Sequence, residues 1–206
     1  MAVFINEVGE RYDSNVLQGE INQSVTPDAI DDLYISGQIS SWSPREAATR
    51  ELIDVLGFTG YQAAQIVNAI TIPNLPKPAW LTDERSKQIQ GVYQKYLGRE
   101  ADPGGLKWWW GSGAPISEIE SGFRGTQEFT DRKNTYEAQI KQVFKEKTGR
   151  NPTAAELSQY TDQYMFGGTL SSVTQQIAQQ TVTAAENPLD NWLKGASYDK
   201  SLIPSD

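Results

Sequence analysis

Residues 93–129 read YQKYLGREADPGGLKWWWGSGAPISEIESGFRGTQEF, and this stretch decides the fold. Apolar residues just before the stretch and at its start recur every three or four positions, as on a helix that packs one face on a core: Ile89, Val92, Tyr93, Tyr96 and Leu97. Gly98 suits the left-handed conformation that ends a helix. Asp102 can cap the next helix, and Pro103 fits its first position. The stretch therefore predicts a pair of helices joined by a short turn.

The same pattern returns further along the chain at a constant distance. Six residues have an identical or similar residue 51 positions later (149 − 98, 157 − 106). The six are Ile89, Val92, Tyr93, Gly98, Arg99 and Leu106, and their counterparts, in the same order, are Ile140, Val143, Phe144, Gly149, Arg150 and Leu157. The offset then grows by a few residues, because Gly113, Ile119 and Phe123 correspond to Gly168, Val173 and Ile177. Thr153–Glu156 forms a capping box in place of Asp102 and Pro103. We predict a tandem helical repeat.

The first copy resembles the bacterial and phage family known as domain of unknown function 4214. The elements of that pattern stand here as Tyr93, Leu97-Gly98-Arg99, Asp102-Pro103-Gly104-Gly105-Leu106, Trp109, Gly113, Ile119, Phe123 and Glu128-Phe129. The resemblance covers one clear copy at about 89–130 and a degenerate one at about 140–182, in which Thr148 and Thr153 replace the Leu and the Asp. The family has no settled activity and occurs in phage virion proteins and bacterial exported proteins. The resemblance therefore implies a fold module and, by that occurrence, a structural role.

Two arginines follow the repeated glycines, and each permits two interpretations. Arg99 and Arg150 could form an anion site, or each could pair with a local carboxylate such as Asp102, or bond the carbonyls that end its helix. A residue repeated at a turn usually serves the turn. We therefore assign Gly98, Arg99, Asp102, Pro103, Gly149 and Arg150 a structural role.

Three consecutive tryptophans, Trp108 to Trp110, are the most conspicuous candidates for a binding surface. Successive residues of a helix point about 100° apart, so at least one indole is expected to face outward. We favour Trp109 for the core, with its neighbours under the following loop. An outward indole would serve as an interface anchor or as a platform for a sugar ring. Trp108, Trp110 and Trp192 are the candidate interface residues.

Composition narrows the chemistry that the chain can perform. Its 206 residues contain no cysteine and no histidine. Disulfides, thiolate or imidazole metal ligands and Ser-His-Asp or Cys-His catalysis are thereby excluded. Carboxylate chemistry remains, but Glu118 and Glu128 form no recognisable pair. We predict a non-enzymatic protein without cofactor or metal.

The net charge of −8 is unevenly distributed. Residues 1–80 hold four Lys and Arg against ten Asp and Glu, a balance of −6, and residues 81–206 hold fourteen against sixteen. Cations gather along one predicted helix, including Lys141 and Lys145. A weakly basic face on an acidic protein is usually solvated, so we do not expect nucleic-acid binding. These lysines could instead meet the acidic first third of an adjacent copy, and they complete the candidate interface.

Punctuation by proline and glycine predicts an all-α protein, made of helical repeats with an extended N-terminal arm. Helices are expected from Thr26-Pro27 and from Ser43-Pro44 onward, and over 61–70. Pro73, Pro76 and Pro78 predict a semi-rigid linker. The predicted regions are an arm (1–25), an acidic helical region (26–70), the Pro-rich linker (71–80), the repeat domain (81–186), and a short helix with a tail (187–206).

These observations favour one function and leave two alternatives open. The N-terminus lacks the pattern of a secretory signal, and no run of about twenty apolar residues predicts a membrane span. We expect a structural protein of a phage particle, made in the host cytoplasm, which contacts other virion proteins as an oligomer at the tail, portal junction or capsid surface. The alternatives are a bacterial surface or secreted adhesion-type module, and a glycan-binding or glycan-cleaving protein that uses the tryptophans.

Overall fold

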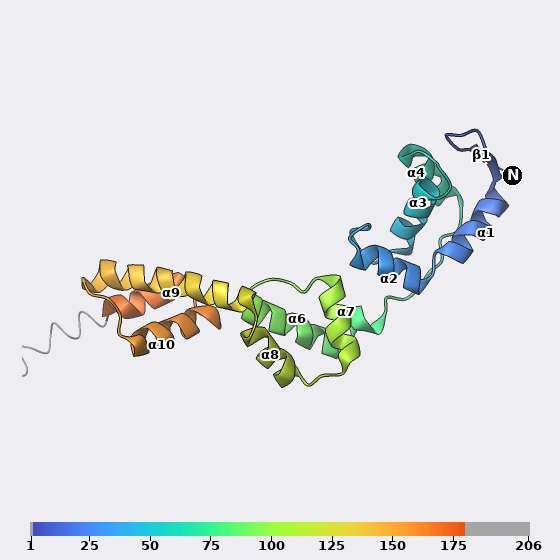
Figure 1. The fold of residues 1–206 in the computed structure, drawn as a ribbon. Helices are drawn as coiled ribbons and strands as arrows, with labels where there is room; N and C mark the ends of the chain where they lie inside the picture. The colour runs from blue at the N-terminus through green and yellow to red at the C-terminus, as the bar shows by residue number, and fades with distance from the viewer. Residues whose placement is uncertain (1, 180–206) are drawn as a thin grey trace, which may run out of the picture. The chain divides into compact units, whose positions relative to one another are not determined.

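The computed structural model describes residues 2–179, and the predicted helix at 187–206 with Trp192 lies outside this range. The described chain is mostly helical, with one two-stranded sheet (Figure 1). The prediction of an all-α protein is thus confirmed at the level of fold class. Among these residues, no helix is both long and apolar enough to cross a bilayer.

The chain divides into two compact units at points other than the Pro-rich linker. The first unit comprises the residues up to Tyr93 together with Arg99–Ile119, and the second comprises Gln94–Gly98 and the chain from Glu120 onward. The linker at 71–80 therefore lies inside the first unit. Helix α6 (Glu84–Leu97) contributes residues to both units.

The first residues form a hairpin that packs on the protein's own chain. Strands β1 (Val3–Ile5) and β2 (Arg11–Asp13) pair antiparallel, with Phe4 opposite Tyr12. In the turn, the Asn6 side-chain amide donates to the Leu56 carbonyl at 2.8 Å, and the Glu7 amide donates to the Gly57 carbonyl at 3.1 Å. These bonds tie the hairpin to the loop after the third helix.

The prediction of an extended arm over 1–25 is wrong for residues 14–24, which form α1 (Ser14–Ser24). Asp13 caps this helix by accepting from the amides of Asn15 and Val16. Leu17 and Ile21 stand one helical turn apart and are completely buried. Sparse but correctly spaced apolar residues were sufficient for a helix, because tertiary packing rather than propensity stabilises it.

Three helices follow, each opened by a side-chain cap. They are α2 (Pro27–Ile35), capped by Thr26, α3 (Pro44–Asp54), capped by Ser43, and α4 (Gly60–Ala69), capped by Thr59. Residues 71–78 have no regular structure, which agrees with the three prolines there. The short α5 (Ala79–Thr82) then carries Trp80 into the core, where it is 4% exposed.

The remaining helices come in two sets of three. The first set is α6, α7 (Pro103–Ser112) and α8 (Ile116–Arg124). The second is the C-terminal half of α9 (Gln127–Thr148), α10 (Ala154–Met165) and the helical residues 170–179. The second set encloses its own apolar cluster: Ile140, Val143, Phe144, Tyr160, Val173 and Ile177. Figure 1 shows α9 and α10 side by side.

Candidate functional site

Helix α7 carries the three tryptophans, and its sequence determines where it begins and ends. Asp102 accepts from the Gly105 amide at 2.7 Å, and Pro103 occupies the first turn, where its missing N–H is not needed. Gly113 ends the helix with φ of 67°, in the left-handed region that glycine adopts without a steric penalty. The three indoles therefore leave one regular helix in three directions.

The three indoles differ sharply in exposure. Trp108 is 64% exposed, whereas Trp109 and Trp110 are half-buried. The rings of Trp108 and Trp109 meet edge to face, with centroids 4.5 Å apart and an interplanar angle of 77°. The Trp110 indole N–H donates to the Asp83 carboxylate at 2.7 Å. Trp108 is thus the outward indole, while Trp110, a candidate anchor by sequence, has an intramolecular partner.

The C-terminal end of α7 is held by Arg85. Its guanidinium donates to the carbonyls of Trp109 at 3.0 Å, Trp110 at 3.2 Å and Ala114 at 2.8 Å. The carbonyls of Trp109 and Trp110 belong to the last turn of α7, whose carbonyls have no backbone amide of the helix to accept from, and a cation there also complements the helix dipole. The hydrogen bond from the Ser86 amide, followed by that from Trp110, lowers the pKa of Asp83. Both contacts fix the orientation of the tryptophan helix.

A buried carboxylate holds the side of α7 and was not identified from the sequence. Asp31 of α2 accepts from the indole N–H groups of Trp42 at 2.7 Å and Trp80 at 3.1 Å, and from the Lys107 ammonium at 2.7 Å. The Asp31 side chain is 8% exposed and that of Lys107 is 39% exposed. Lys107 Nζ also lies 5.9 Å from the centre of the Trp80 ring. This Asp31 cluster joins α2, α5 and α7, so it fixes the residue immediately before Trp108.

The two turn arginines bind carbonyls and carboxylates of their own turns. Arg99 donates to the Glu100 carbonyl at 3.0 Å and lies 3.7 Å from the Asp102 carboxylate. Arg150 donates to the Asn151 carbonyl at 3.1 Å and binds both oxygens of Glu156, at 2.8 Å and 2.5 Å. The structure therefore places local partners at both positions where the sequence left an anion site open.

The two turn glycines share a conformation but differ in their surroundings. Gly98 has φ of 73° and Gly149 has φ of 74°. A Cβ atom at Gly98 would lie 3.1 Å from the Arg132 guanidinium, whereas nothing lies within 4 Å of one at Gly149. Arg132 in turn donates to the Lys95 carbonyl at 2.9 Å, at the end of α6. Arg132, one of the cations of α9, thus has a packing role.

The lysines proposed as interface residues have contacts within their own helix. Lys141 lies 3.9 Å from the Glu137 carboxylate, and its side chain is 54% exposed. Lys145 donates to the Gly149 carbonyl at 3.1 Å, where a cation is favourable at the C-terminal end of α9. Lys141 therefore remains accessible to a partner, and Lys145 serves its own helix end.

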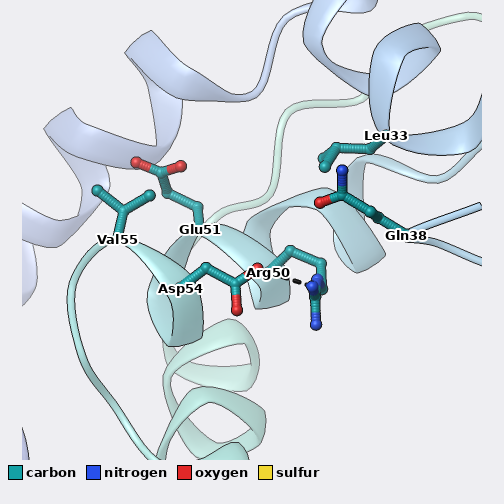
Figure 2. A pocket seen from close by; sticks show the side chains of 6 residues that line it. All are labelled: Leu33, Gln38, Arg50, Glu51, Asp54 and Val55. Atoms are coloured by element: carbon teal, nitrogen blue, oxygen red, sulfur yellow. Dashed lines mark ion pairs between the residues drawn. The ribbon is translucent and has the colours of Figure 1, made fainter. Parts of the chain in front are cut away.

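The ends of α2 and α3 enclose a small pocket of about 180 Å³ (Figure 2). The Arg50 guanidinium pairs with Asp54 at 2.9 Å, and the Glu51 carboxylate lies at the opposite end of the labelled group. Burial, then the charges of Glu20 and Asp54, raises the pKa of Glu51. The volume is below the roughly 300–1,000 Å³ of ordinary ligand pockets, and we assign no ligand to it.

Neither protein-family models, nor curated proteins, nor solved structures yield a match to this chain. The resemblance to the domain of unknown function 4214 family therefore stays a prediction. Within residues 2–179, no group of three acidic, cysteine or histidine side chains is arranged to hold a metal ion. The exposed indole of Trp108, on a helix fixed at both ends and on one side, is the best-defined candidate site.

Proposed function

We propose that this chain is a non-enzymatic structural protein that acts through protein–protein contacts, as a component of a phage virion. The observation that carries the proposal is the exposed Trp108 indole on a fixed helix. Tryptophan is among the residues that contribute most to interface energies, and truncating such an anchor typically costs about 2–4 kcal/mol of binding free energy. Trp108 would bury its indole against another virion protein at the tail, the portal junction or the capsid surface.

Pre-organisation of α7 is the second support for an interface at Trp108. The Asp31 cluster holds Lys107, and Arg85 holds the end of the helix one turn later. The ring of Trp109 lies against that of Trp108, which limits the rotamers of the exposed side chain. Because less conformational entropy is lost on association, a fixed anchor contributes more affinity than a mobile one.

The repeat expected from the sequence also belongs to this proposal. Each set has three helices in the same order, and α7 and α10 each begin one residue after a capping side chain, Asp102 or Thr153. Arg99 lies 5.2 Å from the Tyr93 ring, and Arg150, 51 positions later, lies 5.3 Å from the Phe144 ring. These matches support two copies of one module, as in repeat proteins that present binding surfaces rather than active sites.

Charge would set the register between adjacent copies. The first third of the chain carries a balance of −6, and Lys141 is accessible on α9. A contact between this lysine and acidic residues of a neighbour would steer orientation more than it would add affinity. It would therefore weaken with salt.

One alternative has a specific observation in its favour. An exposed indole is also a platform for a sugar ring, so Trp108 would equally suit a glycan-binding module on a bacterial surface. The two functions predict different partners for the same side chain, a protein or a glycan. A test must therefore follow both assembly and glycan binding in the same variants.

The first experiment measures the absolute mass of the purified protein by light scattering, over a range of concentrations and at two salt levels. The variants are Trp108→Ala and Lys141→Glu, with Tyr61→Ala as the matched control, because Tyr61 is also an exposed aromatic, at 74%. We expect a closed oligomer that loosens in salt. Trp108→Ala should weaken it by roughly 30-fold or more, Lys141→Glu should weaken it less, and Tyr61→Ala should leave it unchanged.

A monomer of 22.9 kDa under every condition would contradict self-assembly. Incubation with phage structural proteins and with a panel of bacterial glycans then distinguishes binding to another virion protein from binding to a glycan. Trp108-dependent binding to a glycan would replace the virion proposal with the glycan-binding alternative.

A further inference from the structure

The second compact unit contains a pocket that none of the contacts described above uses. It has a volume of about 420 Å³ and lies between α9 and the helical residues 170–179. Gln139, Val143 and Glu146 line it from α9, and Leu170 and Thr174 line it from the following helix. Its volume falls within the roughly 300–1,000 Å³ range of ligand pockets.

The pocket presents more acceptors than its own residues satisfy. Gln139 Oε1 is buried and has no hydrogen-bond partner in the part of the chain that the structure describes. Glu146 accepts from the Gln142 amide at 2.8 Å, which occupies one of its oxygens. The Thr174 hydroxyl donates to the Leu170 carbonyl at 2.7 Å, so its lone pairs remain available. A buried acceptor without a donor is rare in native proteins and calls for a missing partner.

The equivalent positions in the first copy of the proposed repeat hold an ion pair within the chain. Glu146 corresponds to Lys95 (146 − 51), and Thr174 corresponds to Glu120 (174 − 54), by the same offset that relates Ile119 to Val173. In the first copy these two positions form an ion pair, with Lys95 Nζ 2.8 Å from the Glu120 carboxylate. The lysine also lies 5.0 Å from the centre of the Tyr96 ring. A lysine of the chain itself thus bridges the helices of the first copy.

The second copy has a carboxylate where the first has its lysine, and a hydroxyl where the first has its carboxylate. We propose that this pocket binds a lysine side chain of a partner protein, which takes the place that Lys95 occupies in the first copy. The ammonium would bind the Glu146 carboxylate and Gln139 Oε1, while its methylene groups would pack on Val143 and Leu170. The inference rests on the proposed repeat and on the proposed function as a protein-binding module.

Lys147 also lines the pocket, and its position is consistent with this assignment. It follows Glu146 directly on α9, so the two side chains leave the helix about 100° apart. A carboxylate and an ammonium in one pocket would bind the side chain of a lysine and a carbonyl of its backbone, respectively. An extended segment that presents a lysine satisfies both.

The test uses Nα-acetyl-lysine amide as the probe, titrated into the whole protein and followed by backbone amide chemical shifts. Nα-acetyl-norleucine amide is the matched probe, because it has an apolar side chain of similar length without the ammonium. We expect saturable shifts at Val143, Glu146 and Leu170, with a Kd on the order of millimolar. The norleucine probe should bind at least 10-fold more weakly.

The decisive variant transfers the ion pair of the first copy into the second, as Glu146→Lys combined with Thr174→Glu. Its own lysine would fill the pocket, so we expect at least a 10-fold loss of probe binding with an unchanged circular dichroism spectrum. Glu146→Gln keeps the side-chain size, so it tests the charge alone should the double variant not fold. Glu137→Gln is the control, because Glu137 is another carboxylate of α9 that does not line the pocket.

Equal binding of the two probes, or full binding to the double variant and to Glu146→Gln, would overturn the proposal. Light scattering of the same samples shows whether the protein assembles, so failure of the pocket proposal can be distinguished from failure of the proposed function. A Trp108-dependent oligomer without lysine binding overturns only the pocket. Lysine binding at Glu146 by a protein that stays monomeric supports the pocket and contradicts only the self-assembly part of the proposed function.

Discussion

The turns at Arg99 and Arg150 hold their arginines through three contacts each. The contacts with an aromatic ring and with a carbonyl are the same in both turns, and the contact with a carboxylate differs. In both, the guanidinium lies over an aromatic ring, at 5.2 Å or 5.3 Å, and donates to the carbonyl of the next residue. The carboxylate partner differs, because Arg99 has the distant Asp102 whereas Arg150 binds Glu156 through two hydrogen bonds. The ring and carbonyl contacts therefore follow from the backbone turn, and the ion pair can move between neighbouring positions.

A larger difference separates the ways in which the two sets of helices are stabilised. The second set encloses an apolar cluster contributed wholly by residues 140–177. The tryptophan helix of the first set is instead held by Asp31, which comes from a helix more than 70 residues earlier in the chain. The second set is thus supported by local apolar packing, whereas the first set adds this long-range polar contact to buried apolar residues such as Leu106 and Ile119.

Removal of the Asp31 carboxylate should cause the largest loss of stability, because it removes the long-range contact of the first set. Asp31→Ala leaves two indole N–H groups without an acceptor in a buried site, and we expect a loss of about 3 kcal/mol in the free energy of unfolding of the first unit. The half-exposed Lys107 contributes little of this, because solvent screens it. Urea unfolding followed by tryptophan fluorescence measures the change. Asp32→Ala, at an exposed neighbour, should stay within about 0.5 kcal/mol, and equal costs for the two variants would contradict a specific role of Asp31.

Substitution of alanine for the two turn glycines, Gly98 and Gly149, should lower the stability of the protein by an intermediate amount and distinguish the two turns. Gly149→Ala forces a left-handed alanine and should cost about 1 kcal/mol. Gly98→Ala should cost roughly 1 kcal/mol more, because its Cβ lies 3.1 Å from the guanidinium of Arg132, which the Lys95 carbonyl holds in place. Thermal unfolding of both variants gives the two values. The same loss at both positions would show that Arg132 moves aside freely.

Acid should cause a smaller loss of stability, because it protonates Glu156 in the ion pair of the second turn. The hydrogen bond from Arg150, followed by that from the Thr153 amide, lowers the pKa of Glu156 from its ordinary 4.5 to about 2. Between these values the unfolded chain binds the proton and the folded chain does not. The contribution of Glu156 to stability is therefore complete above pH 4.5 and is lost as the pH falls toward 2.

Melting temperatures between pH 5 and pH 2 measure this contribution. Glu156→Gln should show a shallower decline with acid than the unchanged protein. Asp102→Asn removes the charge of the 3.7 Å pair of the first turn and keeps a side-chain oxygen that can accept from the Gly105 amide, so it should keep the full decline. Parallel curves for all three proteins would mean that the Arg150 pair does not contribute to folding.

Local patterns in the sequence predicted most helices, whereas contacts between residues far apart in the chain could not be predicted from such patterns. Thr26, Ser43, Asp102 and Thr153 identify helix starts because a cap acts on amides two or three residues away. Helix α1 was missed because only Leu17 and Ile21 mark its buried face within a polar segment. Its stability comes from packing on α3, which no local window contains.

The site could be predicted only in part, for the same reason. Helical geometry predicts one outward indole among three but cannot decide which, because that depends on what covers the other two. Asp31 looked like one acid in an acidic region, and only folding brings Trp42, Trp80 and Lys107 to it. One signal was available: an indole N–H needs an acceptor when it is buried, so two isolated tryptophans in an acidic region indicate a carboxylate.

The Asp31 cluster also bears on which segments of this chain recombination can transfer between genes. A recombination point within residues 71–78 would separate the carboxylate from two of its three donors, Trp80 and Lys107. The recombinant would inherit the tryptophan helix without the residue that aligns it. The second set of helices carries its apolar cluster within a single short segment and can be transferred intact. Selection would therefore keep residues 26–119 as one inherited block, whereas the second set can be inherited by itself.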